Sequence, residues 1–173
     1  MSAVSFAVIA LVLYICVMLK EIFILVKMLF ASKPSEVTKV EVVDMHHFPF
    51  RGYKAMQWCG KIIHRIGSSQ VDDKTIRHET IHLMQAKVCG SWIKYYWRYF
   101  VEWFKGGIFL NPASAAYYTS RYESEAYANE DNPGYCANYD GSNLQKYVFK
   151  KRKKLYKQVG GTPKDWKNYI KSL

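Results

Sequence analysis

The motif His78-Glu79-Thr80-Ile81-His82 lies within residues 72–85, which read DDKTIRHETIHLMQ. On a helix, two histidines four residues apart lie on one face, roughly 6 Å apart, so both imidazoles can reach one metal ion. Glu79 points to a neighbouring part of that surface, close enough to hold a metal-bound water. This spacing is typical of a zinc peptidase, which needs two nitrogen ligands, a carboxylate base and an open coordination position. The alternative is a surface helix with two chance histidines, and a third ligand would distinguish the two.

The residues around the motif carry the signals of a helix start and a helix end. Asp72 or Asp73 can cap the start, and this acidic pair suits the positive end of the helix dipole. The pair Cys89-Gly90 offers a C-terminal stop. The sequence therefore predicts a helix over residues 73–89.

The candidate for a third ligand lies in residues 120–130, which read SRYESEAYANE. Ala and Glu make this stretch helix-prone, and Thr119 or Ser120 could cap it. Here the chain resembles the gluzincin metallopeptidases, including the membrane-anchored CAAX prenyl protease and HtpX group. Those enzymes pair the HExxH helix with a later Glu on a second helix, in the pattern Ser-Arg, one or two residues, then Glu-x-x-Ala-Asp. Residues 120–126 match that pattern up to the Ala.

The resemblance implies that His78, His82 and Glu123 bind Zn²⁺ and that Glu79 is the general base. Tyr127 stands where the family usually has Asp. The contact that orients a metal-bound histidine must therefore come from another residue.

Glu125 is the alternative third ligand. It lies two residues from Glu123, and on a helix the two carboxylates diverge by about 200°, so only one can face the histidines. Glu123 is the first choice. A metzincin arrangement is excluded, because Gln85 and Val88 stand where that group has Gly and a third His.

Length and composition indicate an ordered, basic chain. Its 173 residues are one domain's worth, and half of them are hydrophobic, which argues against global disorder. The formal charge of +11 suggests anionic lipid or nucleic acid as a neighbour. The four cysteines are scattered, with no Cys-x-x-Cys pair, and are expected to be reduced thiols.

The N-terminal segment predicts a membrane anchor over residues 1–31. Residues 3–19 carry no charge and approach the roughly 20 residues that a tilted helix needs to cross a bilayer. Lys20, Glu21 and Lys27 interrupt the apolar character, so the second part is expected to continue the helix into the interface. A buried core helix is the weaker alternative, because the segment is apolar on every side.

The charges that flank this span predict its orientation. No charged side chain precedes it, and four lysines follow it, at positions 20, 27, 33 and 39. By the positive-inside rule, a single-pass protein of this kind has its C-terminal part in the cytoplasm.

Three short stretches alternate like strands: residues 40–42, 53–59 and 61–65. The last two pivot on Gly60 and form either two strands or one bent strand. In zinc peptidases a small sheet ahead of the metal helix offers an edge to which extended substrate can pair. We expect part of residues 53–65 to serve as that edge.

Two further segments suggest membrane contact. Residues 91–110 are rich in Trp, Tyr and Phe with one charged stripe, which favours an in-plane helix on the bilayer; a core helix with one exposed stripe is the alternative. Residues 144–159 are expected to form a basic helix that carries KKRKK at residues 150–154. Anionic lipid headgroups are the expected partner of this cluster, and nucleic acid or plain solvation is the alternative. Thr162-Pro163 predicts the start of a last short helix.

Together these patterns predict a mostly helical α+β protein of minimal zincin-like architecture. A transmembrane anchor (residues 1–31) precedes a domain (residues 32–173) in which a small sheet packs on the HExxH helix. The expected function is a membrane-anchored zinc metallopeptidase that acts on peptide or protein substrates. An oxyanion stabiliser is also needed. The candidates are Tyr122 and Tyr127, with Tyr117 and Tyr118 also placed suitably in the sequence.

Two alternatives from other classes remain open at this point. One is an inactive membrane scaffold in which zinc is a structural staple. The other is a membrane-tethered nucleic-acid binder that uses Lys150–Lys154. The peptidase is favoured because neither alternative requires Glu79.

Overall fold

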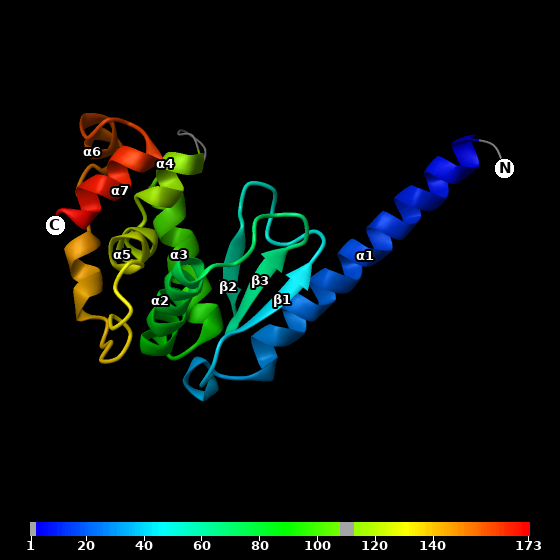
Figure 1. Cartoon of the computed structure of the whole chain (residues 1–173), viewed down its shortest axis with the longest axis horizontal. Coiled ribbons are helices and arrows are strands. Elements are labelled where there is room, and N and C mark those ends of the chain that lie inside the picture. Colours follow the sequence, from blue (N-terminus) through cyan, green and yellow to red (C-terminus); the bar gives the residue numbers. More distant parts are fainter. Residues whose placement is uncertain (1–2, 108–112) are drawn as a thin grey trace. The chain divides into compact units, whose positions relative to one another are not determined.

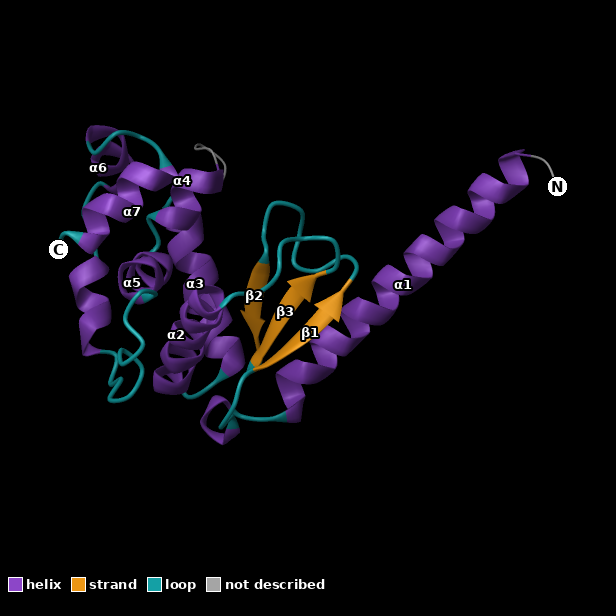
Figure 2. Ribbon diagram, viewed as in Figure 1, coloured by secondary structure: helices purple, strands orange, loops and turns teal. Residues whose placement is uncertain are grey.

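The computed structural model of the protein describes residues 3–107 and 113–173 (Figure 1). These residues form two compact units, Met1–Val71 and Asp72–Leu173. The first contains one long helix and a three-stranded sheet, and the second contains helices (Figure 2). The expected α+β class, mostly helical with one small sheet, is confirmed. The zincin-like architecture, the 1–31 and 32–173 division, and the packing of the sheet on the HExxH helix stay predictions.

The first unit contains α1 (Ala3–Ala31), a short 3₁₀ turn (Pro34–Glu36) and the strands β1 (Glu41–Met45), β2 (Ala55–Trp58) and β3 (Lys61–Arg65). The strand order is β1-β3-β2, so β1 and β2 are the edges. β1 pairs parallel to β3, and β2 pairs antiparallel to β3.

β2 and β3 are two separate strands because a tight turn divides them. Cys59 and Gly60 both adopt positive φ values, 47° and 83°. Such a pair of left-handed residues is typical of a two-residue hairpin turn. A side chain at position 60 would also collide with Val37, whose nearest carbon would lie 2.6 Å from the added Cβ.

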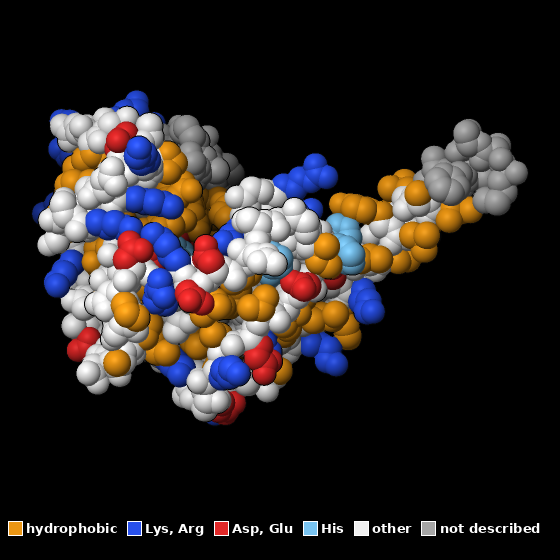
Figure 3. Space-filling model, viewed as in Figure 1, with side chains coloured by type: hydrophobic (Ala, Val, Ile, Leu, Met, Phe, Trp, Pro, Cys, Tyr) orange, Lys and Arg blue, Asp and Glu red, His pale blue; other side chains and the backbone are white. Residues whose placement is uncertain are grey.

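Helix α1 is long and apolar enough, over Val8–Ala31, to cross a membrane. Its large apolar side chains are exposed along most of its length, and they cover the visible face of the helix in Figure 3. Towards its C-terminal end the helix instead packs on the sheet, where Leu25 forms a buried cluster with Met45 and Ile63. The Nε1–H group of Trp58 donates to the backbone carbonyl of Leu25 at 2.9 Å.

Glu21, the acidic residue within α1, has a specific role in this packing. Its carboxylate accepts hydrogen bonds from the backbone N–H groups of His46 (2.6 Å) and His47 (2.9 Å). It also lies 3.0 Å from Nδ1 of His47. A buried carboxylate is stable when donors surround it. The sequence suggested a helix that simply continues into the interface, whereas this part of α1 is hydrogen-bonded to the loop after β1.

The second unit contains six helices among its described residues. The predicted helix over residues 73–89 is confirmed as α2 (Asp73–Cys89), with the Asp72 side chain as N-cap and Gly90 in the left-handed conformation at its end. The others are α3 (Trp92–Lys105), α4 (Ala113–Tyr118), α5 (Arg121–Asn129), α6 (Arg152–Gln158) and α7 (Pro163–Lys171).

The aromatic and C-terminal segments differ from their predictions in detail. The predicted aromatic helix is α3 up to Lys105, and residues 108–110 of that prediction lie outside the described residues. Residues 144–159 are not one helix: a 3₁₀ helix (Ser142–Tyr147) precedes α6, and Lys151 between them has a φ of 53°. The chain turns there because Phe149 packs edge-on against the fully buried Trp166 of α7, with ring centroids 5.1 Å apart. The predicted start of α7 at Thr162-Pro163 is confirmed by the Thr162 cap.

Candidate metal centre

Helices α2 and α5 bring His78, His82 and Glu123 together. One ligand atom from each residue lies within 4.8 Å of the other two, and all three residues are buried. Nε2 of His78 lies 3.4 Å from Oε2 of Glu123, and Nε2 of His82 lies 3.1 Å from Oε1. These are the three residues that the sequence suggested as ligands.

Hydrogen bonds outside the cluster hold the two helices in this position. The Nε–H group of Arg77 on α2 donates to the backbone carbonyl of Glu130 at 2.8 Å. The side-chain amide of Gln85, also on α2, donates to the backbone carbonyl of Tyr122 at 3.0 Å. The helices are therefore joined on both sides of the histidine pair.

Each histidine has a partner for its other ring nitrogen. Nδ1 of His78 lies 3.0 Å from Oε2 of Glu130, and Nδ1 of His82 lies 2.8 Å from Oε1 of Gln85. Gln85 directs this oxygen to His82 because its amide nitrogen donates to the Glu125 carboxylate at 2.7 Å. Acceptors at both Nδ1 positions favour the tautomer in which Nε2 carries a lone pair. In the neutral rings that a metal ion would bind, both lone pairs would lie on the side of Glu123.

Glu123 has one satisfied and one unsatisfied oxygen. Tyr99 donates its hydroxyl hydrogen to Oε1 at 2.6 Å. Oε2 is buried and accepts no hydrogen bond within the described part of the chain. A buried carboxylate oxygen without a donor is costly unless a cation is close. Two imidazole nitrogens and a carboxylate oxygen are the donor set that zinc prefers, so the residues present fit a zinc ion.

The pKa values of His78, His82 and Glu123 also indicate that a positive charge beside Glu123 is favoured. Burial disfavours the charged form of His78, but the carboxylates of Glu123 and Glu130 outweigh it and raise its pKa to about 10. Burial likewise opposes protonation of His82, yet Glu123 raises its pKa. For Glu123, burial opposes ionisation, and the two histidines nonetheless hold its pKa well below the usual range. The centre therefore favours positive charge beside Glu123.

Glu79 is buried on the same helix. Burial lowers the pKa values of His78 and His82, and the negative charge of Glu79 is among the causes that raise them, after Glu123 and, for His78, Glu130.

The tyrosines that the sequence suggested as oxyanion stabilisers fall in different places. The Tyr127 ring lies against His78, with centroids 4.4 Å apart, and burial followed by Glu123 raises its pKa far above the usual range. Burial and then Glu123 also raise the pKa of Tyr117. Tyr118 packs on Tyr127 with ring centroids 5.4 Å apart.

Tyr122 faces another part of the unit. Its ring packs against those of Tyr95 and Tyr99, at centroid distances of 5.5 and 5.6 Å. Burial raises its pKa to about 12, and the next contribution comes from Cys89. The residues that contribute to this pKa after burial, first Cys89 and then Arg121 and Arg98, are not members of the metal centre.

Glu125, the alternative third ligand, is turned away from the histidines. It is fully buried and accepts hydrogen bonds from the hydroxyl groups of Tyr135 and Tyr139, each at 2.8 Å, in addition to the Gln85 amide. Three donors satisfy this carboxylate without a metal ion.

Sequence reasoning did not identify Glu130, Gln85 or Tyr99 as parts of this centre. Glu130 follows Glu123 by seven residues, which returns it to the same helical face after about two turns, so a signal was present. Gln85 lies three residues after His82 and so shares its face. Tyr99 comes from α3, and nothing in the sequence places that helix beside Glu123.

No protein-family model, curated protein or solved structure matches this chain. The likeness to the gluzincins thus rests on the two short segments around His78 and Glu123.

Proposed function

We propose that the protein is a membrane-anchored zinc metallopeptidase. The observation that supports this best is the convergence of three buried ligand atoms, from His78, His82 and Glu123, within 4.8 Å of one another. Glu79 is buried in the same motif, and we assign it the role of general base.

Each residue of the centre has a defined task in this proposal. His78, His82 and Glu123 hold the zinc ion, which when bound polarises the scissile carbonyl and lowers the pKa of a water molecule. The Glu79 carboxylate accepts a proton from the attacking water and delivers it to the leaving amide nitrogen. We assign Tyr127, whose ring lies beside His78, as the donor of a hydrogen bond to the oxygen on which negative charge develops.

The substrate is proposed to be a peptide or protein segment in extended conformation. Since β2 is an edge of the sheet, it has backbone groups with which such a segment could pair. Helix α1 anchors the protein, with the second unit on the cytoplasmic side.

Metal content and hydrolysis, measured together, test this proposal. The full chain is purified in detergent, reconstituted with zinc and assayed on labelled casein and on a mixed peptide library read by mass spectrometry. We expect about one zinc per chain in the wild type and in Glu79→Gln, much less in His82→Ala, and hydrolysis only in the wild type. Glu36→Gln, an exposed carboxylate in the first unit, is the matched control and should behave as wild type.

Three outcomes would contradict the proposal. A fully active Glu79→Gln protein excludes Glu79 as the base. A wild-type chain that takes up no zinc excludes the metal centre. A chain that binds zinc through four protein ligands, and is as inactive as Glu79→Gln, is a scaffold in which zinc is structural.

A further inference from the structure

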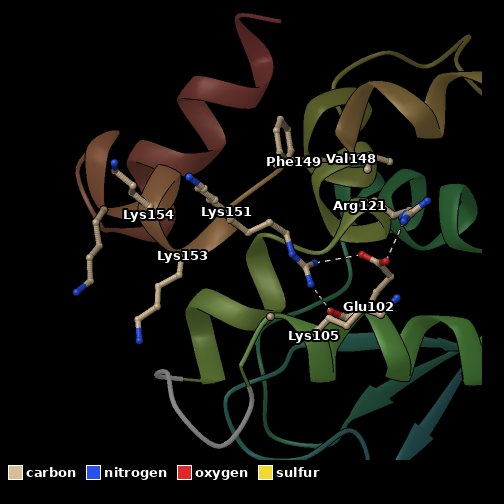
Figure 4. A pocket seen from close by; sticks show the side chains of 11 residues that line it. Glu102, Lys105, Arg121, Val148, Phe149, Lys151, Lys153 and Lys154 are labelled. Carbon is tan, nitrogen blue, oxygen red and sulfur yellow. Dashed lines mark hydrogen bonds and ion pairs between the residues drawn. The ribbon is translucent and has the colours of Figure 1, made fainter.

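A cavity of about 660 Å³ lies between the end of α3 and the segment that leads into α6 (Figure 4). Seven of its eleven lining residues are Lys or Arg, and Glu102 is the one acidic residue among them. Seven positive charges and one negative charge leave the lining at +6. A concave surface of one sign concentrates ligands of the opposite sign.

Two arginines of this cavity are fixed by Glu102. Its Oε1 accepts from Arg121 at 2.8 Å, and its Oε2 accepts from Arg152 at 3.2 Å. Arg152 also donates to the backbone carbonyls of Glu102 (2.6 Å) and Thr119 (3.2 Å). Because Arg152 is held by three acceptors, its charge is placed before any ligand arrives.

The lysines around these arginines have no carboxylate partner within the described part of the chain: Lys105, Lys151, Lys153, Lys154 and Lys157. Figure 4 shows Lys151, Lys153 and Lys154 extending from the segment that borders the cavity. This segment begins at Lys151, whose φ of 53° is unfavourable for a residue with a side chain, by about 1 kcal/mol or more. The strained backbone at Lys151 thus lies at the start of a segment that brings several positive charges to the cavity.

Helix α3 adds an exposed apolar face beside the cavity. Trp97, Phe100 and Phe104 are exposed at 65%, 44% and 49%, and neighbouring rings lie 6.1 and 6.2 Å apart. Lys105, which lines the cavity, lies about a quarter turn round the helix from this face. Exposed aromatic rings flanked by basic residues are typical of a surface that rests at the membrane–water boundary.

We propose that this cavity binds the phosphate groups of an anionic phospholipid headgroup. The lysine ammonium groups can contact phosphate oxygens, and the fixed guanidinium groups of Arg121 and Arg152 add positive charge beside them. A lipid is favoured over a free phosphate compound because the rings of Trp97, Phe100 and Phe104 offer contact with acyl chains. The proposed anchoring of the chain by α1, which is long and apolar enough to span a bilayer, would also raise the local concentration of headgroups. The site is independent of the metal centre.

Lipid binding to the full chain in a neutral detergent tests this proposal by native mass spectrometry. The probes are short-chain phosphatidylinositol 4-phosphate, phosphatidylcholine, soluble inositol 1,4-bisphosphate and a 20-nucleotide RNA. We expect a one-to-one complex with the phosphoinositide and none with phosphatidylcholine. The triple variant Lys151→Gln/Lys153→Gln/Lys154→Gln should weaken it by about 100-fold, since each lysine contributes about fivefold near anionic headgroups.

The matched control is Lys39→Gln/Lys146→Gln/Lys164→Gln, which removes the same charge from exposed lysines that neither line the cavity nor belong to the 150–154 cluster. It should retain wild-type affinity, and Trp97→Ala should weaken lipid binding but not binding of the soluble bisphosphate. Unchanged zinc content and circular dichroism in each variant show that the fold and the metal centre persist.

Four results would overturn the proposal. No phosphoinositide complex, or equal losses in the two triple variants, excludes a specific cavity site. Soluble bisphosphate that binds as tightly as the lipid assigns the cavity to a free phosphate compound. RNA that binds more tightly than the lipid and is lost in the cavity variant assigns it to nucleic acid.

Discussion

Nδ1 of His78 lies 3.0 Å from Oε2 of Glu130, the residue at the C-terminal cap of α5. The opposite nitrogen of the same ring faces Glu123, near the start of that helix. One face of α5 therefore supplies a carboxylate to each side of the imidazole. This arrangement fixes the orientation of His78, and Glu130, as the acceptor at Nδ1, leaves Nε2 on the side of Glu123 for a metal ion.

Glu130→Gln should weaken zinc binding by about 10–100-fold without unfolding the protein. The amide keeps the shape of the side chain but removes the negative charge beside Nδ1. Zinc affinity is measured by competition with a chelator of known affinity. Asp131→Asn is the control, because Asp131 pairs with Lys74 and Lys171, and within the described part of the chain neither histidine is among its ion-pair partners. Equal affinities in the two variants would show that Glu130 does not support the site.

Glu123→Gln and Glu125→Gln should differ in zinc content. Glu123→Gln should fall well below one zinc per chain, because it removes the carboxylate that faces both histidines. Glu125→Gln should retain about one zinc. Its free energy of unfolding should fall by about 1–3 kcal/mol, because a carboxylate that accepts three hydrogen bonds is lost. Elemental analysis and denaturant titration provide the two readouts. Loss of zinc in Glu125→Gln alone would identify Glu125 as the ligand.

Tyr127→Phe should lower kcat by about 100-fold with little change in zinc content, if its hydroxyl group stabilises the oxyanion. Tyr122→Phe should leave kcat nearly unchanged, because the Tyr122 ring packs between Tyr95 and Tyr99. Steady-state kinetics on one peptide substrate compares the pair. The reverse order of effects would assign the role to Tyr122.

The ion pairs of Asp131 should contribute to the free energy of unfolding, and this contribution should be lost at low pH. Lys171 at 2.5 Å and Lys74 at 2.9 Å lower the pKa of Asp131 to about 2. A lowered pKa stabilises the fold above the unfolded-state value of about 3.9, and the contribution is lost as the pH falls towards 2. Because Asp131 is exposed, the contribution is about 0.2–1 kcal/mol per pair.

Denaturant unfolding of the zinc-free protein at pH 5 and at pH 2.5 tests this expectation. Asp131→Asn should be less stable than wild type at pH 5, and the difference should shrink at pH 2.5. A constant difference across this range would mean that the aspartate acts through something other than its charge.

Local signals in the sequence were sufficient for α2 and α7. Asp72 and Gly90 mark the ends of α2, and Thr162-Pro163 marks the start of α7, because caps and stops act within one turn of the chain. The break at Lys151 could not be predicted in this way. It depends on Phe149 packing against Trp166, a contact across many residues of sequence.

The residues of the candidate site also fall into two groups, those that local sequence patterns indicated and those that depend on tertiary packing. The spacing of His78 and His82 and the later segment with Glu123 indicated three residues that the fold does bring together. Glu130, the partner of His78, could have been predicted, because its seven-residue spacing from Glu123 returns it to the same helical face. Tyr99 could not have been predicted, because its contact with Glu123 depends on how α3 crosses α5. Helix crossings are set by side-chain packing.

Hydrogen bonds couple the rotation of α1 to the sheet within the first unit. They run from His46 and His47 to Glu21 and from Trp58 to Leu25. They prevent α1 from turning about its own axis independently of the sheet. The tilt of a spanning helix follows the thickness of its bilayer. If α1 spans a membrane as proposed, a change in membrane thickness that tilts α1 would also rotate the edge strand β2 through the same angle and alter how that edge is presented to an incoming chain.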